Sequence, residues 1–402
     1  DNQTTSGDTT SLGEGTEEET STNVAKIGDT EYATLKEAFD ATEDGDTVTL
    51  LRNVDLGTSG VYLYPLGKTN VHNLTFDLNE CKITSNNSKS YVVAAAREGL
   101  VIKNGTIENT NTNNAATTSA VYVANAGTTT FENVTLTAKG SGVYVKLKTG
   151  VATVNVENGT TISGRYGVYL ECPTNNISTQ SGTEILNVNG GSINGSNAGV
   201  YAKGASSSST NASVGVNITA GTVSNVKVDT KTATTKNDPI KLEISGGTIT
   251  GKVESFGADE ISVSGGEIKG NVTNNGTLTV SGGTIGGTLT NSTHGTITVT
   301  GGTFTAEVPK DYLAEGVTIE DNGDGTYSAV RSGTKNVAKL TSGGSTTYYE
   351  TLQAAVKAAG TTEATITLLK NASGDGVDVA ENQNIVFDFG GHTYPLQGQM
   401  VG

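Results

Sequence analysis

Short runs in which apolar and polar residues alternate recur along most of the chain, and glycine or asparagine dipeptides separate them. Runs such as Leu242–Ile244, Ile261–Val263 and Ile297–Val299 alternate with period two and are rich in β-branched residues, which is typical of strands. The dipeptides recur every 17 to 32 residues, at Asn104-Gly105, Asn133-Val134, Asn158-Gly159, Gly190-Gly191, Ala220-Gly221, Gly246-Gly247, Gly265-Gly266, Gly282-Gly283 and Gly301-Gly302. Such a period is typical of a solenoid, whose repeats bury their apolar faces against their neighbours. The pattern predicts an all-β parallel β-helix over residues 57–308, with one coil per dipeptide.

The segment before the solenoid has a helical pattern instead. Thr34-Leu35-Lys36-Glu37 is a capping box, which predicts a helix that begins after Thr34. Leu35, Ala38 and Phe39 fall on one face of that helix, and a short strand is predicted on each side of it. An amphipathic helix here can cover the open core and unpaired edge of a first coil. We therefore expect residues 24–56 to form a small N-terminal α/β cap.

The same unit returns near the end of the sequence. Four segments of the N-terminal unit and of the first coil match later ones, namely 23–27 with 336–340, 32–39 with 349–356, 47–53 with 365–371 and 73–78 with 384–389. We interpret residues 336–402 as a second copy of the cap and the start of a truncated second module. The natural protein is therefore expected to contain at least two modules.

Two further segments depart from the solenoid pattern. In residues 309–335, Pro309–Leu313 fits one helical turn, while Val317–Glu320 and Thr326–Val330 fit a hairpin around an Asn-Gly-Asp-Gly turn. This segment is the expected C-terminal cap. Residues 1–23 are an acidic Ser/Thr-rich stretch with almost no apolar residues, which predicts a disordered linker.

Composition narrows the class of protein. The 402 residues include 53 Gly, only 5 Pro and no Trp, and hydrophobic residues make up 34%, which suits a thin β-helix core. The net charge is −16, with 25 basic and 41 acidic residues, so a basic stripe for nucleic acid is absent. An acidic surface suits solubility outside a cell. Because the sequence has no apolar run of about 18 residues, we expect no membrane insertion.

Cysteine and histidine do not cluster in the sequence. Cys81 and Cys172 lie roughly three coils apart, which at about 4.8 Å per coil places them about 14 Å from each other, beyond disulfide reach. We therefore expect both to be free thiols in the core. The histidines are scattered, at His72, His294 and His392. The sequence predicts no metal site and no cofactor.

The sharpest candidate for a binding site is a series of tyrosines. Six short runs of the type GVYL place one tyrosine per coil between small apolar residues, at Tyr62, Tyr91, Tyr122, Tyr144, Tyr169 and Tyr201. Since the flanking residues should point inward, we expect the six rings to point outward as one stripe roughly 25 Å long. Tyrosine offers a flat apolar face and a hydroxyl to a sugar or a protein partner. The alternative is that the rings only stabilise the sheet by stacking from coil to coil.

Several carboxylates are candidates for catalytic groups. Glu171 follows Tyr169 by two residues, and Lys146 and Lys203 occupy the equivalent positions one coil before and after. This favours an outward Lys-Glu-Lys ion ladder, which lowers the pKa of Glu171 rather than raising it as a general acid requires. Glu108, Glu132 and Glu157 fall near the dipeptides and are expected to lie close together, but exposure is the default for such residues. We therefore predict no catalytic residue.

The turn near the C-terminal end has an acidic pattern as well. Glu320-x-Asn322-x-Asp324-Gly325 is similar to the first half of a calcium-binding loop, but Arg331 stands where the bidentate glutamate would be needed. A hairpin turn is the better interpretation.

Together, the unit YATLKEAF…GDTVTLL, the GGTI coils and the segment GGTF…YLAEG…DNGDGTY resemble parallel β-helix surface proteins of Gram-positive gut bacteria. More distantly, they resemble the pectate-lyase-like right-handed β-helix superfamily. The resemblance covers about residues 24–402. It implies a right-handed solenoid, secretion, attachment to the cell wall through another part of the chain, and adhesion or glycan contact. It supplies no catalytic motif that can be placed on these residues.

From these observations we expect an extracellular β-solenoid at the cell surface or cell wall, which acts as an adhesin for glycans or a host surface protein. We expect it to be a monomer that does not bind nucleic acid. Two alternatives remain open, a polysaccharide lyase or glycosidase on the same fold and a structural stalk without a ligand, because a fold does not fix a function.

Overall fold

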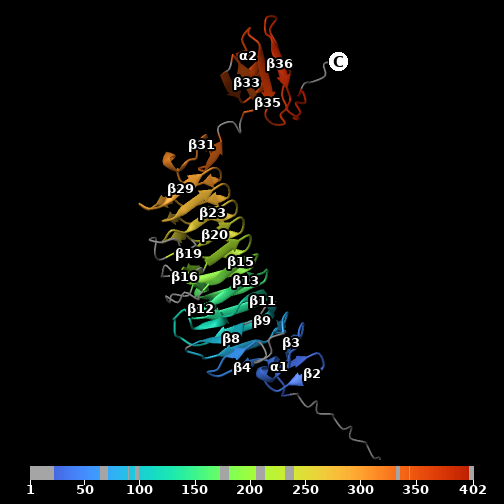
Figure 1. The fold of residues 1–402 in the computed structure, drawn as a ribbon, viewed down its shortest axis with the longest axis vertical. Helices are drawn as coiled ribbons and strands as arrows, with labels where there is room; N and C mark the ends of the chain where they lie inside the picture. The colour runs from blue at the N-terminus through green and yellow to red at the C-terminus, as the bar shows by residue number, and fades with distance from the viewer. Residues whose placement is uncertain are drawn as a thin grey trace, which may run out of the picture.

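The computed structural model describes residues 22–63, 71–88, 90–95, 99–172, 181–204, 213–230, 240–331, 336–343 and 345–397, which we call the described residues. Within them the chain winds into coils that stack along one axis (Figure 1). Most strand pairs are parallel and join residues that are one coil apart in sequence, such as Val156 with Val188 and Val263 with Val280. The predicted all-β parallel solenoid is therefore confirmed. The predicted linker falls on residues 1–23, of which 1–21 lie outside the described residues.

The described strands of the solenoid form three parallel ladders, A, B and C, one on each side of the coil. Ladder A consists of β3 (Thr47–Leu50), β6 (Thr75–Asp77), β9 (Leu100–Asn109), β11 (Gly127–Ala138), β13 (Thr149–Val156), β15 (Ser181–Val188), β17 (Ser213–Ile218), β20 (Lys241–Ile244), β23 (Glu260–Val263), β26 (Thr277–Val280) and β29 (Thr296–Val299).

The long strands β9 and β11 continue around a corner into ladder B. That ladder further contains β4 (Val54–Asp55), β7 (Lys82–Ser85), the first half of β14 (Thr161–Glu171), the first half of β16 (Ser192–Lys203), β18 (Thr222–Val223), β21 (Thr248–Ile249), β24 (Glu267–Ile268), β27 (Thr284–Ile285) and β30 (Thr303–Phe304).

Ladder C carries all six candidate tyrosines. It contains β5 (Val61–Tyr62), β8 (Tyr91–Ala95), β10 (Ser119–Val123), β12 (Ser141–Val145), the second halves of β14 and β16, β19 (Val226–Asp229), β22 (Val253–Ser255), β25 (Val272–Asn274) and β28 (Leu289–Asn291).

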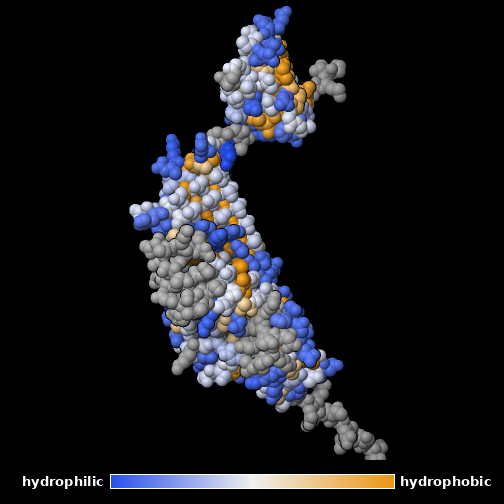
Figure 2. Space-filling model, in the orientation of Figure 1, coloured by the Kyte–Doolittle hydropathy of each residue, from blue (hydrophilic) through white to orange (hydrophobic). Residues whose placement is uncertain are grey.

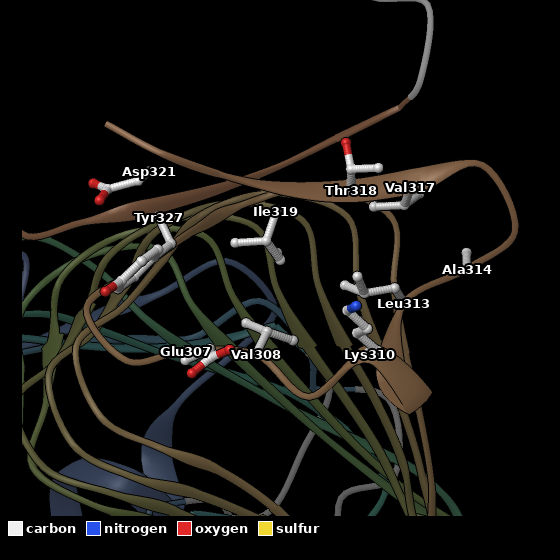
Figure 3. A pocket seen from close by; sticks show the side chains of 10 residues that line it. All are labelled: Glu307, Val308, Lys310, Leu313, Ala314, Val317, Thr318, Ile319, Asp321 and Tyr327. Carbon is white, nitrogen blue, oxygen red and sulfur yellow. The ribbon is translucent and has the colours of Figure 1, made fainter. Parts of the chain in front are cut away.

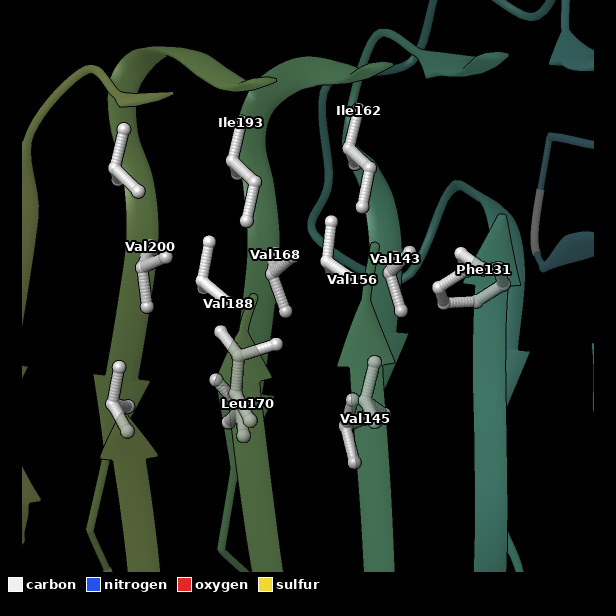
Figure 4. Close-up of a cluster of buried hydrophobic side chains, with 14 of the residues drawn as sticks. Phe131, Val143, Val145, Val156, Ile162, Val168, Leu170, Val188, Ile193 and Val200 are labelled. Carbon is white, nitrogen blue, oxygen red and sulfur yellow. The ribbon is translucent and has the colours of Figure 1, made fainter. Parts of the chain in front are cut away.

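The core is a set of apolar columns that run along the axis. In ladder B the inward residues of successive coils pair with one another, from Ile162 through Ile193, Val223, Ile249, Ile268 and Ile285 to Phe304. Figure 4 shows Ile162 and Ile193 aligned in this way, beside the matching trio Val143, Val168 and Val200. All of these side chains are buried. Because burial of each contributes about 1.5–3 kcal/mol, a thin core that continues from coil to coil can hold the fold together.

The glycine and asparagine dipeptides of the sequence lie at the corners between ladders A and B. Asn104 and Asn133 have positive φ, as do the second glycines of the later dipeptides. At Gly266, φ is 74° and an added Cβ would lie 2.5 Å from the carbonyl oxygen of Gly246, one coil earlier. A corner that needs positive φ and close backbone approach accepts glycine best, which explains why the dipeptide recurs.

The N-terminal α/β unit packs against the first coils. β1 (Ala25–Ile27) pairs antiparallel with β2 (Thr30–Tyr32) and with β3. Helix α1 (Leu35–Ala41) begins with the predicted capping box, in which Glu37 N donates to Thr34 Oγ1 and Thr34 N donates to the Glu37 carboxylate, both at 3.2 Å. Phe39 of α1 is buried and meets Phe76 of β6 edge to face at 5.1 Å.

The solenoid is followed by a short turn and a hairpin. The turn η1 (Lys310–Tyr312) precedes β31 (Val317–Asp321) and β32 (Tyr327–Arg331), which pair antiparallel. β32 also pairs antiparallel with β30 and so extends ladder B. The predicted turn and hairpin are confirmed, and Asp324 accepts hydrogen bonds from the backbone and hydroxyl of Thr326 within the loop.

Residues 336–397 repeat the N-terminal unit in three dimensions. They contain β33 (Ala338–Ser342), β34 (Ser345–Tyr349), α2 (Leu352–Ala358), β35 (Ala364–Leu368) and β36 (Ile385–Asp388). Ala338 pairs with Tyr349 and Leu368, just as Ala25 pairs with Tyr32 and Leu50 in the first copy. The two helices begin with N-caps of nearly the same backbone angles, and the second copy has a core of its own.

The two copies differ in what covers them. In the first copy β6 pairs with β9 of the next coil, and Leu78 is fully buried. In the second copy β36 has no such neighbour among the described residues, and Phe389, the counterpart of Leu78, is 47% exposed. Figure 2 shows apolar residues gathered along one side of this unit.

No helix in the described part of the chain is long and apolar enough to cross a membrane.

Candidate functional site

The predicted tyrosines form one stacked series on ladder C. Tyr122, Tyr144, Tyr169 and Tyr201 occupy equivalent register positions in four successive coils. Neighbouring rings lie with their centroids 5.1 to 5.8 Å apart along the whole series from Tyr62 to Tyr201. The sequence therefore located the series correctly.

Tyr91 occupies a different register position from the one its sequence run suggests. Ala94, three residues later, pairs with both Tyr62 and Tyr122 and so holds the tyrosine position in this coil. The ring of Tyr91 nevertheless lies between its neighbours, 5.8 Å from the ring of Tyr62 and 5.5 Å from that of Tyr122. The ring of Tyr91 therefore fills the gap in the series that Ala94, which has no ring, would otherwise leave.

Exposure divides the six tyrosines. Tyr62 is 45% exposed, whereas Tyr144 and Tyr169 are only 5% and 6% exposed. Tyr91, Tyr122 and Tyr201 are intermediate. Tyr144 and Tyr169 belong to a small outer cluster with Tyr166 and Ala198, against which Ala116 also packs. The expected open stripe is therefore interrupted in its middle, because side chains from other parts of the coils cover it.

The orientation of the rings decides which of their surfaces a ligand can reach. From Tyr91 through Tyr122 and Tyr144 to Tyr169, successive rings are inclined by only 17° to 29°, so that each covers the face of the next. Stacked rings present edges and hydroxyls to the outside, not faces. Tyr62, inclined by 63° to Tyr91, stands at the open end of the series. Tyr201 at the other end is inclined by 64° to Tyr169 but is less exposed, so Tyr62 offers the most accessible aromatic face of the series.

The predicted ion ladder beside the tyrosines is confirmed. Glu171 lies 3.5 Å from the Lys146 ammonium and 3.4 Å from that of Lys203, one coil away on either side. The Tyr144 hydroxyl also donates to the Glu171 carboxylate at 2.6 Å. Partial burial alone would raise the pKa of Glu171, but the Tyr144 hydrogen bond and the two ammonium charges outweigh it and lower that pKa. Glu171 is therefore held ionised and is not a general acid.

The register also decides which tyrosine hydroxyls find an acceptor. Tyr144 pairs with Tyr169 of the next coil, and its hydroxyl donates to Glu171, two residues after Tyr169. Likewise, Tyr201 pairs with Lys227, and its hydroxyl donates at 3.0 Å to Asp229, two residues after Lys227. For Tyr122 and Tyr169 the same position holds Lys146 and Lys203, which can only donate. Within the described ranges neither of these two hydroxyls makes a hydrogen bond. Burial raises the pKa of both, so they stay protonated.

Sequence reasoning missed a buried carboxyl, Glu184. It points into the core from β15, next to Leu186 and Val188 in the alternation of that strand, and is fully buried. Its Oε1 accepts a hydrogen bond from the backbone N–H of Leu147, 2.9 Å away, while Oε2 has no hydrogen-bond partner in the described part of the chain. Burial raises the pKa of Glu184 to about 8. The signal in the sequence was a glutamate at an inward position of an alternating strand.

The other candidate carboxylates do not converge as expected. Glu132 and Glu157 do follow paired residues of ladder A and are neighbours. Glu108 instead lies in ladder B, where it forms an ion pair with Lys82. Glu157 accepts a hydrogen bond from Asn189 at 2.8 Å. The three therefore do not form one carboxylate group, because β9 turns the corner before Glu108.

The remaining predicted features have plain structural surroundings. Neither Cys81 nor Cys172 forms a disulfide, as predicted. Cys172 is buried, whereas Cys81 is only half-buried, against the prediction of a core position. Among the described residues no group of three His, Cys, Asp or Glu side chains is placed to hold a metal ion.

Comparisons with family models, curated proteins and solved structures found no match for this chain.

Proposed function

We propose that this chain is an extracellular binding module, an adhesin of a secreted or wall-attached bacterial surface protein, which contacts a glycan or a host surface protein. On this proposal the solenoid is right-handed, residues 24–56 and 309–335 cap its two ends, and residues 336–402 begin a second module. Three facts support this organisation. Helix α1 packs on the first coils, and the hairpin follows the last coil. In addition, the second unit exposes an apolar face whose counterpart in the first unit is buried by the next coil. The protein is proposed to act as a monomer.

The observation that carries the binding proposal is the open end of the tyrosine series. Tyr62 exposes almost half of its surface at the end of a column of rings that is otherwise stacked and partly covered. Beside this column, the Tyr122 hydroxyl has no acceptor among the described residues and Lys146 is 35% exposed. An aromatic face followed by hydroxyl and ammonium groups suits the apolar face and hydroxyls of a sugar, or an equally amphipathic protein surface. The proposed ligand site therefore extends from Tyr62 to Tyr122.

The test is a glycan-array and host-protein screen of the full chain beside its Tyr62→Ala variant. We expect the wild type to bind a ligand and Tyr62→Ala to bind it at least about tenfold more weakly, since an exposed aromatic anchor commonly carries that much binding energy. Tyr348→Ala is the matched control, because Tyr348 is 54% exposed but lies in the C-terminal unit. Equal loss in both variants would contradict the proposed position, and no binding by the wild type would favour a stalk.

The alternative of a carbohydrate-active enzyme has one observation in its favour. Environments that push two carboxyl pKa values apart are typical of acid and base pairs, and Glu184 and Glu171 show this, with one pKa raised and the other lowered. However, Glu184 faces the core and Glu171 faces outward, so the pair does not share a substrate position. Turnover of a polysaccharide that is lost in Glu171→Gln would support the enzyme over the binding module.

A further inference from the structure

A cavity lies at the far end of the solenoid from Tyr62. It has a volume of about 650 Å³ and separates the hairpin β31–β32 from the last coil (Figure 3). Its middle is apolar, with Val308 and Leu313 on the side of the coil and Ile319 on the side of the hairpin. Cavities of this size with mostly apolar walls and a few polar groups are typical ligand sites.

The alternation of β31 explains how charge enters this cavity. Val317 and Ile319 point towards the solenoid, and Asp321 follows on the same side of the strand, directly opposite Tyr327 in the hairpin. Tyr327 in turn pairs with Phe304, the last residue of the ladder B core column. An acidic residue and a tyrosine thus stand where the next apolar layer of the core would be.

The charged groups are separated along the cavity. Glu307 and Asp321 lie on either side of the Tyr327 ring at one end, and Lys310 lies near Leu313 at the other end (Figure 3). In the described part of the chain, none of these three charges has an ion-pair partner. Asp321 Oδ1 accepts from the backbone N–H of Gly323 at 2.8 Å, which leaves its other oxygen for a ligand. Two carboxylates and a ring therefore line one end of the cavity, and no cation of the described residues pairs with either carboxylate.

We propose that this cavity binds an arginine side chain from a peptide segment of a partner protein. The aliphatic stem lies along Val308 and Ile319, and the guanidinium stacks on the Tyr327 ring and pairs with the Glu307 carboxylate, while Asp321 adds negative charge at the same end of the cavity. Arginine combines an apolar stem with a planar cation that both pairs with carboxylates and stacks on an aromatic ring. Lys310 at the opposite end repels a second basic residue and so favours a neutral or acidic neighbour in the peptide. This site is independent of the proposed tyrosine site.

The proposal is tested with the full chain and the capped peptide acetyl-Val-Arg-Val-amide, observed through the Ile319 δ-methyl signal in a methyl NMR titration. We expect a saturable shift of this signal below about 10 mM peptide, the weak affinity that one anchored side chain supplies. The citrulline peptide, which keeps the shape but lacks the charge, should bind at least about tenfold more weakly because charge-assisted hydrogen bonds are lost. Equal binding of both peptides, or no shift with the arginine peptide, would overturn the proposal.

Two variants locate the interaction. Glu307 is exposed and makes no hydrogen bond to the other described residues, so Glu307→Gln should leave the rest of the methyl spectrum unchanged while weakening arginine-peptide binding about fivefold or more. Glu315→Gln is the matched control, because Glu315 is exposed in the same segment but does not line the cavity. An unchanged affinity in Glu307→Gln, or the same loss in Glu315→Gln, would contradict the assigned position.

Discussion

Replacing Glu184 with glutamine should make the protein more stable at pH 8. It should also abolish most of the decrease in stability that the wild type shows between pH 5 and pH 8. Burial holds the pKa of Glu184 at about 8 in the folded chain, against 4.5 for an ordinary glutamate. Between these values the folded chain keeps a proton that the unfolded chain has released, so stability falls as pH rises, by up to about 1.4 kcal/mol per pH unit. Below pH 4.5 the contribution is fully present, and above pH 8 it is lost.

The expected gain from Glu184→Gln at pH 8 is on the order of 3–5 kcal/mol, because glutamine stays neutral at every pH and can still accept from the Leu147 N–H. It is measured as the urea midpoint of unfolding at pH 5, 6.5 and 8. Glu315→Gln, an exposed glutamate, should keep the pH dependence of the wild type. If the midpoint of the wild type does not fall over this range, or if Glu184→Gln falls equally, the buried neutral carboxyl is not what limits stability.

The inward position of Glu184 follows from the alternation of β15, but its hydrogen-bond partner does not follow from any pattern in the sequence. Alternation predicts the strands, and the repeated GVYL-type runs predict which residues of neighbouring coils pair, which is why the Lys146–Glu171–Lys203 ladder follows from the sequence. Glu184 depends on a contact that no pattern contains: its partner Leu147 lies 37 residues earlier, at a turn. Coils of unequal length bring such turns together differently each time. The chemistry at the corners therefore follows from the folded chain and not from the repeat.

The tyrosines illustrate the same limit. Their stacking follows from equal register positions, which the repeated GVYL runs reveal. Their exposure depends on Tyr166, which lies on the same strand as Tyr169 but stands outside the repeat, and on Ala116, which comes from a loop. The position of Tyr91 depends on a three-residue offset that leaves Ala94 in the tyrosine column. Sequence pattern thus predicts which residues share a column, whereas side chains outside the repeat decide how much of that column a ligand can reach.

Truncation of Tyr144 should therefore destabilise the protein far more than truncation of Tyr62. Tyr144 is 5% exposed, stacks between Tyr122 and Tyr169, and donates a hydrogen bond to ionised Glu171. Tyr144→Ala removes a buried ring and leaves that carboxylate short of a donor, so we expect a loss of about 3–5 kcal/mol in the free energy of unfolding. Tyr62→Ala removes a ring that is 45% exposed, and the expected loss is about 1 kcal/mol or less.

Tyr144→Phe separates the two causes, since it keeps the stacked ring and removes only the hydroxyl. A hydrogen bond to a charged group contributes about 1.5–3 kcal/mol, so this variant should fall between the wild type and Tyr144→Ala in urea unfolding at pH 7. Equal stability of Tyr62→Ala and Tyr144→Ala would mean that the rings in the middle of the series are not part of the packed structure. In ligand binding we expect the opposite ranking, with Tyr62→Ala more damaging than Tyr144→Ala. That result would indicate a binding site at the open end of the series, whereas its absence would indicate that the series serves stability alone.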